Sequence, residues 1–294
     1  MDSEVTKTIF VDGEYNAHGD CYRFIFPKPN ITMLHHVWLE ETCDIYKALF
    51  VGCDLSHECL SSFTFEICQK GTELPFFFTR AHGGFPMFAT PYYEVGVDLY
   101  LKTPRDKTVS TPLKMGLCVS VEPNSDKFDK RVQKQVENQI ENPLSLDYPN
   151  IIYRDGKIVD NCFNTNVNTS DKILAIVFRA KDANGNYMLA SDLNVDYYFD
   201  SVLQSTIREC THDLNRNKFT YFKSDDYITV QTFIPDIYNI PNSREVTSLK
   251  DLRLQLEFSG AIIPESIELS CMRHQNVLFQ GGVCGIKLFD YSNK

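Results

Sequence analysis

The feature that most constrains the fold of this chain is a series of short runs in which apolar and polar residues alternate. Alternation with a period of two is typical of a strand with one buried face. Turn-forming residues separate the runs, as at Pro27–Asn30 and at Asp182–Asn186, where a hairpin turn is expected. The predicted strands are Ile31–Leu39, Tyr46–Val51, Ser62–Cys68, Tyr93–Leu101, Leu113–Val121, Lys172–Arg179, Tyr227–Phe233, Leu249–Phe258 and Ser266–Met272. Many short strands with turns between them favour an antiparallel β-sandwich or jelly roll.

A helix is predicted in residues 126–142, where apolar residues recur every four positions, at Phe128, Val132, Val136 and Ile140. Ser125 or Asp126 is expected to cap its start, and Pro143 is expected to end it. A weaker helical pattern covers Val202–Leu214.

The domain organisation follows from the place of the first helix, which lies near the midpoint of the 294 residues with strand patterns on both sides. Because 43% of the residues are hydrophobic, the chain has enough apolar material for two ordinary cores. We therefore expect an all-β protein with two consecutive antiparallel sandwich domains. The first is expected to span residues 1–143 and to include the helix, and the second residues 144–294.

The charge balance bears on the partners and the compartment. The chain carries 39 acidic and 29 basic residues, a formal net charge of −10, so direct binding to nucleic acid is not expected. The first residues, Met1 to Glu4, are acidic and do not resemble a signal peptide. No window approaches 18 uninterrupted apolar residues, so a transmembrane helix is not expected either. These features favour a folded protein that is not secreted.

The ten cysteines do not follow a recurring metal-binding or redox spacing, since no CxxC pair occurs. The densest cluster places Cys53, His57 and Cys59 close together. A metal site there stays open, but buried and unreactive thiols are the favoured interpretation.

Residues that could carry catalysis are scarce. His35 and His36 are the only close histidine pair, and neighbouring residues of a strand point to opposite faces, which disfavours a shared metal ion. Hydrogen-bonded or half-exposed histidines are expected instead. Neither a nucleophile elbow, a phosphate-binding loop nor an HExxH motif occurs. We therefore assign no catalytic residue, metal or cofactor, and expect that the protein is not an enzyme.

The most specific segment lies at the end of the first third of the chain and includes Leu74, Pro75, Phe76, Phe78, Arg80, Gly84, Pro86, Ala89, Tyr93, Glu94 and Val95. In the order of these residues it resembles the signature of the double jelly-roll major capsid proteins of nucleocytoplasmic large DNA viruses.

The end of the chain is similar to the terminal motif of the same family. Its matching positions are Asn276, Val277, Leu278, Gly281, Gly282, Gly285, Tyr291, Ser292 and Asn293. Between the two motifs, Lys172–Arg179 is similar to the hydrophobic strand that opens the second roll of the family.

The resemblance implies a double jelly roll whose motif residues have structural roles. It also implies a homotrimer with a near-hexagonal outline that tiles a shell in the virion, after assembly in the host cytoplasm. Penton, minor or membrane-linked capsid proteins are the expected partners. The chain is shorter than typical members, so a minor capsid or internal scaffold paralogue is an alternative. A lectin-like host-binding module and a cupin-type metalloenzyme are the others; the lone Trp38, expected in the core, does not favour a glycan platform.

Overall fold

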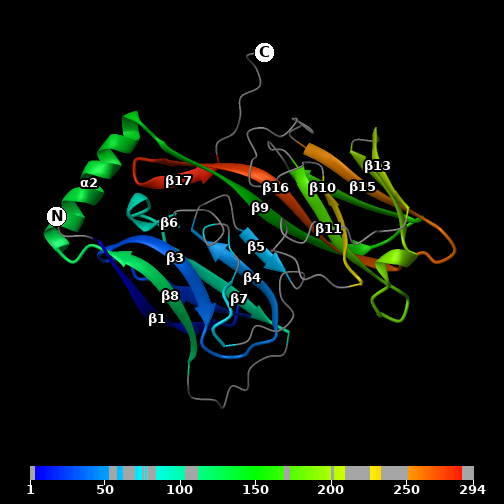
Figure 1. Cartoon of the computed structure of the whole chain (residues 1–294), viewed down its shortest axis with the longest axis horizontal. Helices are drawn as coiled ribbons and strands as arrows, with labels where there is room; N and C mark the ends of the chain where they lie inside the picture. The colour runs from blue at the N-terminus through cyan, green and yellow to red at the C-terminus, as the bar shows by residue number, and fades with distance from the viewer. Residues whose placement is uncertain are drawn as a thin grey trace. The chain divides into compact units, whose positions relative to one another are not determined.

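The structure is a computed structural model that describes residues 4–52, 58–61, 70–74, 76, 78, 84–102, 112–168, 173–199, 202–208, 226–232 and 251–286 (Figure 1). The described residues form mainly antiparallel strands, together with helix α2 (Ser125–Glu141). This confirms the prediction of a mostly β chain with a helix in the middle. No helix in these ranges is long and apolar enough to cross a membrane.

The chain divides into two compact units, Met1–Tyr148 with Asn276–Lys287, and Pro149–Gln275 with Leu288–Lys294. The expected boundary at residue 143 lies near Tyr148, where the chain first passes from one unit to the other. The division differs from the expected one in that a late segment of the chain groups with the first unit. Strands β9 (Leu144–Lys157) and β16 (Ser266–Gln280) contribute residues to both units.

The first unit contains an eight-stranded path in the order β5-β4-β7-β2-β1-β8-β3-β6. Its members are β1 (Val5–Asn16), β2 (Cys21–Ile25), β3 (Ile31–Leu39), β4 (Ile45–Val51), β5 (Glu58–Ser61), β6 (Phe85–Pro86), β7 (Gly96–Leu101) and β8 (Leu113–Val121). Strand β1 joins the two halves of this path, because its residues 5–13 pair with β8 and its residues 14–16 pair with β2. The 3-10 helix η1 (Met87–Ala89) follows β6 directly.

The second unit is built from two sheets. One has the order β10-β15-β12-β13, and in the other β11 pairs with β14 on one side and with β16 on the other. The bounds are β10 (Cys162–Asn168), β11 (Ile173–Lys181), η2 (Ala190–Asp192), β12 (Asn194–Phe199), β13 (Val202–Arg208), β14 (Thr229–Thr232) and β15 (Asp251–Ser259). Strand β17 (Val283–Ile286), which belongs to the first unit, pairs with the end of β16.

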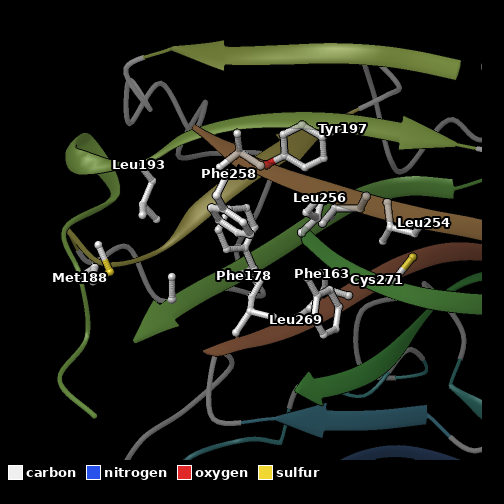
Figure 2. Close-up of a cluster of buried hydrophobic side chains, with 14 of the residues drawn as sticks. Phe163, Phe178, Met188, Leu193, Tyr197, Leu254, Leu256, Phe258, Leu269 and Cys271 are labelled. Atoms are coloured by element: carbon white, nitrogen blue, oxygen red, sulfur yellow. The ribbon is translucent and has the colours of Figure 1, made fainter. Parts of the chain in front are cut away.

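Aromatic and aliphatic side chains from both sheets fill the core of the second unit (Figure 2). The Phe178 ring on β11 lies 6.0 Å from that of Phe258 on β15, edge to face, and 6.4 Å from that of Tyr197 on β12. Alternate residues of each strand point into this core, as the period-two pattern predicts.

Several predicted elements are confirmed by the structure. Strands β3 and β8 have the predicted bounds, and the hairpin turn after β11 closes through Asp182, whose Oδ1 accepts hydrogen bonds from the amides of Asn184 and Asn186. Helix α2 begins one residue earlier than expected. The predicted strand at residues 62–68 lies outside the described residues.

Two local predictions are wrong. The second helical pattern, predicted over Val202–Leu214, begins as strand β13, because residues 202–208 pair along the length of β12. Tertiary pairing there outweighs a weak helical spacing. The cap of α2 is Asn124, whose Oδ1 accepts a hydrogen bond from the amide of Lys127 at 3.0 Å. Asparagine is among the best residues at this position, so it takes the role expected for Ser125 or Asp126.

Trp38 is half-buried rather than part of the core. Its Nε1 donates a hydrogen bond to Glu40 Oε1 at 2.7 Å, and its indole lies where a side chain at Gly116 would otherwise stand, directly across the β3–β8 pair. This placement satisfies the indole N–H, which a buried tryptophan would also require.

Candidate functional site

The first sequence motif contributes three buried aromatic or aliphatic side chains to the core of the first unit: Leu74, Phe76 and Phe78. The Phe50 ring on β4 lies 5.6 Å from that of Phe76 and 4.9 Å from that of Phe78. Such tilted aromatic pairs stabilise a core beyond their buried area. This part of the motif therefore has a packing role.

Gly84 and Pro86 set the backbone that leads from the motif into β6. Gly84 has φ +80°, and a Cβ on it would lie 2.5 Å from the carbonyl oxygen of Leu34, so only glycine fits there. Pro86 is buried and pairs with Met33 of β3. These two residues allow a close approach of the chain to β3.

The last part of the motif leads into β7. Val95 is buried, and its carbonyl oxygen accepts a hydrogen bond from the amide of Phe26 at 2.8 Å. Tyr93 is half-buried and Glu94 is exposed. Within this stretch only Glu94 presents a charged side chain to solvent.

The second motif meets the first one inside the first unit. Val277 and Phe279 of β16 are buried, and the Phe279 ring lies 5.9 Å from that of Phe85. Leu278 pairs with Gly285 of β17, and Asn276 lies on β16 just before them.

The turn between β16 and β17 also packs on helix α2 (Figure 1). The amide of Gly282 donates a hydrogen bond to Oε1 of the buried Gln139 at 3.0 Å. A Cβ on Gly282 would lie 2.6 Å from Cε2 of Tyr92 and 3.1 Å from Cγ2 of Val136. The two motifs and α2 thus converge on Gly282, a contact that no local sequence pattern could reveal.

Five predicted motif residues, Pro75, Arg80, Tyr291, Ser292 and Asn293, lie outside the described residues. The same holds for Cys53 and His57 of the cysteine cluster, and Cys59 is described only as a backbone position of β5. The structural roles expected of the motif residues stay predictions, and so do the buried thiols expected of the cysteine cluster.

Both histidines of the close pair are engaged in hydrogen bonds. His35 Nε2 lies 2.8 Å from Ser120 Oγ, and His36 Nδ1 lies 2.6 Å from Glu73 Oε1. The two rings do not point to opposite faces as expected, because the pairing of β3 with β8 shifts register at this point; their centroids lie 6.4 Å apart. Burial, with a smaller contribution from His36, lowers the pKa of His35. No group of three or more potential ligands in the described part of the chain is placed to hold a metal ion.

Five described cysteines form no disulfide bond: Cys21, Cys43, Cys118, Cys162 and Cys271. Burial raises the pKa of Cys21, Cys118 and Cys162, which keeps these thiols protonated at neutral pH and hence weak nucleophiles.

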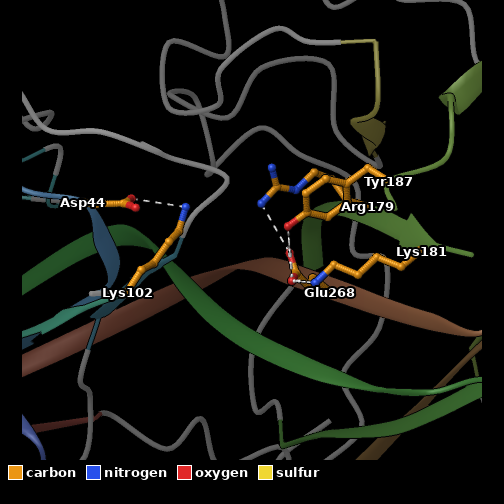
Figure 3. Close-up of polar contacts among 6 residues, drawn as sticks. All are labelled: Asp44, Lys102, Arg179, Lys181, Tyr187 and Glu268. Atoms are coloured by element: carbon orange, nitrogen blue, oxygen red, sulfur yellow. Dashed lines mark hydrogen bonds and ion pairs between the residues drawn. The ribbon is translucent and has the colours of Figure 1, made fainter. Parts of the chain in front are cut away.

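The densest charged cluster of the second unit surrounds Glu268 (Figure 3). Its carboxylate accepts from Lys181 Nζ at 2.6 Å and from Arg179 Nη2 at 3.3 Å, and Tyr187 Oη lies 3.2 Å away. Burial and then the Glu268 charge raise the pKa of Tyr187. Burial acts to lower the pKa of Lys181, but the hydrogen bond to Glu268 and its charge outweigh burial and raise this pKa. Both donors therefore keep their protons at neutral pH, as expected of a structural cluster.

The fold is similar over nearly its whole length to solved capsid proteins. The chain of PBCV-1 VP54, fitted into a reconstruction of the virophage Sputnik, matches with a TM-score of 0.61 and 8% identity, over 99% of this chain and 98% of that one. A quasi-atomic model of the PBCV-1 virus capsid gives the same values. The STIV major capsid protein matches with a TM-score of 0.54 and 9% identity, over 92% of this chain and 96% of that one. No family model and no curated protein matches the sequence.

The chain therefore has the fold of the viral double jelly-roll major capsid proteins. The resemblance read from two sequence motifs is confirmed at the level of the fold, although so few residues are identical.

Proposed function

We propose that this chain is a structural capsid protein that forms homotrimers and, through them, a shell or scaffold lattice in a virion. The single observation that carries the proposal is the match of fold over 99% of the chain to PBCV-1 VP54. A match that covers both units supports a shared architecture of the whole subunit rather than of one common sandwich.

The roles of the motif residues support the same proposal. Leu74, Phe76, Phe78 and Val95 are buried, and Gly84 and Gly282 permit close backbone approaches. Buried residues with a packing role differ from catalytic residues, because catalytic residues require access to a substrate. We accordingly propose a role without catalysis.

The site of action and the partners follow from this role. We propose that the protein assembles in the host cytoplasm and resides in the capsid, with other capsid proteins as partners. Its net charge of −10 keeps free subunits soluble and disfavours direct contact with packaged nucleic acid.

Light scattering coupled to size-exclusion chromatography tests the proposal on the purified full chain. One chain has a mass of 33.8 kDa, so a homotrimer is expected at three times that mass, 101.4 kDa. The measurement is repeated over a series of protein concentrations in the micromolar range and at high salt. A trimer that persists on dilution supports the capsomer. A mass of one chain at every concentration overturns a self-sufficient capsomer.

A further inference from the structure

An open groove of about 740 Å³ runs along helix α2 in the first unit. The opposite wall is formed by residues 28–30 and 87–92. Apolar side chains make up most of its surface, contributed by Pro29, Phe88, Tyr92, Phe128, Val132 and Val136. Tyr92 and Val136 also pack beside Gly282, and the Arg131 guanidinium lies 5.3 Å from the centroid of the Phe88 ring.

The dimensions of the groove fit a single polypeptide segment. Its lining residues on α2 run from Ser125 to Glu137, which corresponds to a length of about 18 Å at the helical rise. About five extended residues would span the groove.

The walls are tied together, so the groove is formed before any ligand binds. Lys28 Nζ donates to the carbonyl oxygen of Thr90, which joins the two loop segments. Asn30 Nδ2 donates to Ser125 Oγ at 3.1 Å, which joins the first loop to α2. Tyr92 packs against Gly282 yet remains 71% exposed. A preformed apolar wall binds a partner without a large cost in ordering.

The charges along α2 indicate the chemistry of the occupant. Asp129 and Glu137 both line the groove and lie about 12 Å apart along the helix. Within the described residues Asp129 has no ion-pair partner, and Glu137 accepts only a hydrogen bond from Gln133 Nε2 at 3.0 Å. On the opposite wall Lys28 donates to the carbonyl oxygen of Thr90 and keeps its positive charge, so the groove has two carboxylates against one cation. An incoming segment would therefore be complementary if it carried Lys or Arg beside its apolar residues.

We propose that this groove binds an extended apolar segment with basic side chains, contributed by a different protein. A second copy of this chain is the less favoured source, because with 39 acidic and 29 basic residues it offers fewer basic than acidic side chains. The proposal does not depend on trimer formation, since every residue it uses lies within the first unit of one chain.

A selection from a library of random decapeptides displayed on phage, with the full-length protein immobilised, tests the proposal. The expected peptides combine apolar residues with Lys or Arg. The affinity of a selected synthetic peptide is then measured for the wild type and for variants. Val132→Asp is expected to weaken binding about tenfold or more, because it places a charge on the apolar wall. Glu141→Lys, on the same helix but outside the groove, is the matched control and should bind like the wild type.

A double charge reversal, Asp129→Lys with Glu137→Lys, tests the electrostatic part separately. It should select acidic apolar peptides in place of basic ones. Circular dichroism and thermal unfolding of each variant establish that the fold is retained, and the control variant supplies the comparison if Val132→Asp does not fold. The proposal would be overturned if the selected peptides bound Val132→Asp and the charge-reversed variant with the same affinity as the wild type. Self-association that Val132→Asp abolishes would also overturn it, since a second copy would then be the occupant, and so would binding of a small apolar dye without any peptide.

Discussion

At the scale of single residues, the backbone at Gly84 shows why one position of the first motif admits a single residue type. Gly84 and Gly71 share almost the same φ, +80° and +79°, but only Gly84 has a neighbour in the way of a side chain. The pair therefore separates the cost of a left-handed backbone from the cost of a collision.

Gly84→Ala is expected to lower the free energy of unfolding by more than about 2 kcal/mol, since both costs apply. Gly71→Ala should cost only about 1 kcal/mol, because its Cβ meets nothing within 4 Å. Urea unfolding of the two variants and the wild type measures the difference. Equal losses would mean that the contact with Leu34 does not restrict this position.

His35 gives the protein a dependence of stability on pH. Because burial lowers its pKa in the folded protein, the unfolded chain takes up the proton first as the pH falls. The contribution of His35 to stability is thus complete above its ordinary pKa of about 6.5 and is lost as the pH falls below that value, through the lowered pKa of the folded protein. In His35→Gln, which can still bond Ser120, thermal unfolding should vary less over this range than in the wild type. An unchanged slope would contradict the role of His35.

At the scale of elements, the sequence predicts best where one face of a strand is buried. Strands β3 and β8 have the predicted bounds because alternate side chains enter the core. Strand β1 escaped prediction, since most of its side chains are exposed and it is held by backbone pairing with β8 and β2. Strand β13 escaped for a related reason, because its partner β12 decides its structure. Local pattern cannot report such pairings.

The Asn124 cap defines the start of α2. Asn124→Ala should lower the free energy of unfolding by about 1 kcal/mol, because the amide of Lys127 loses its acceptor. Asn142→Ala at the other end is the matched control, since Asn142 uses its backbone N–H for the cap. Chemical denaturation compares the two. A larger loss in Asn142→Ala would show that the N-terminal cap is not the stronger one.

The pairing of β11 with β16 is reinforced by Glu268, which lies directly across from Arg179. Arg179 is only 2% exposed, so Glu268→Gln removes a counter-charge from a buried cation. We expect a loss of roughly 3 kcal/mol in the free energy of unfolding. Glu265→Gln, an exposed neighbour, should change it by less than about 0.5 kcal/mol. Similar unfolding midpoints for both variants would contradict a structural role of the cluster.

At the scale of the whole molecule, the two sequence motifs predicted the fold because they occur along this chain in the same order as in the family that they resemble. Their meeting at Gly282 was beyond sequence reasoning, since Tyr92 and Gly282 are far apart in the chain and neither side carries a pattern that names its partner. For the same reason the return of residues 276–287 to the first unit could not be anticipated from composition or spacing. The groove along α2 likewise depends on three separate segments.

We propose that the chain is a capsid subunit that works as a trimer. Single-particle electron microscopy of the purified full chain tests it most directly, because it shows symmetry as well as mass. We predict particles in which three copies surround a threefold axis with a near-hexagonal outline. Monomers, or closed particles of another symmetry, would contradict the claim while leaving the double jelly-roll fold in place.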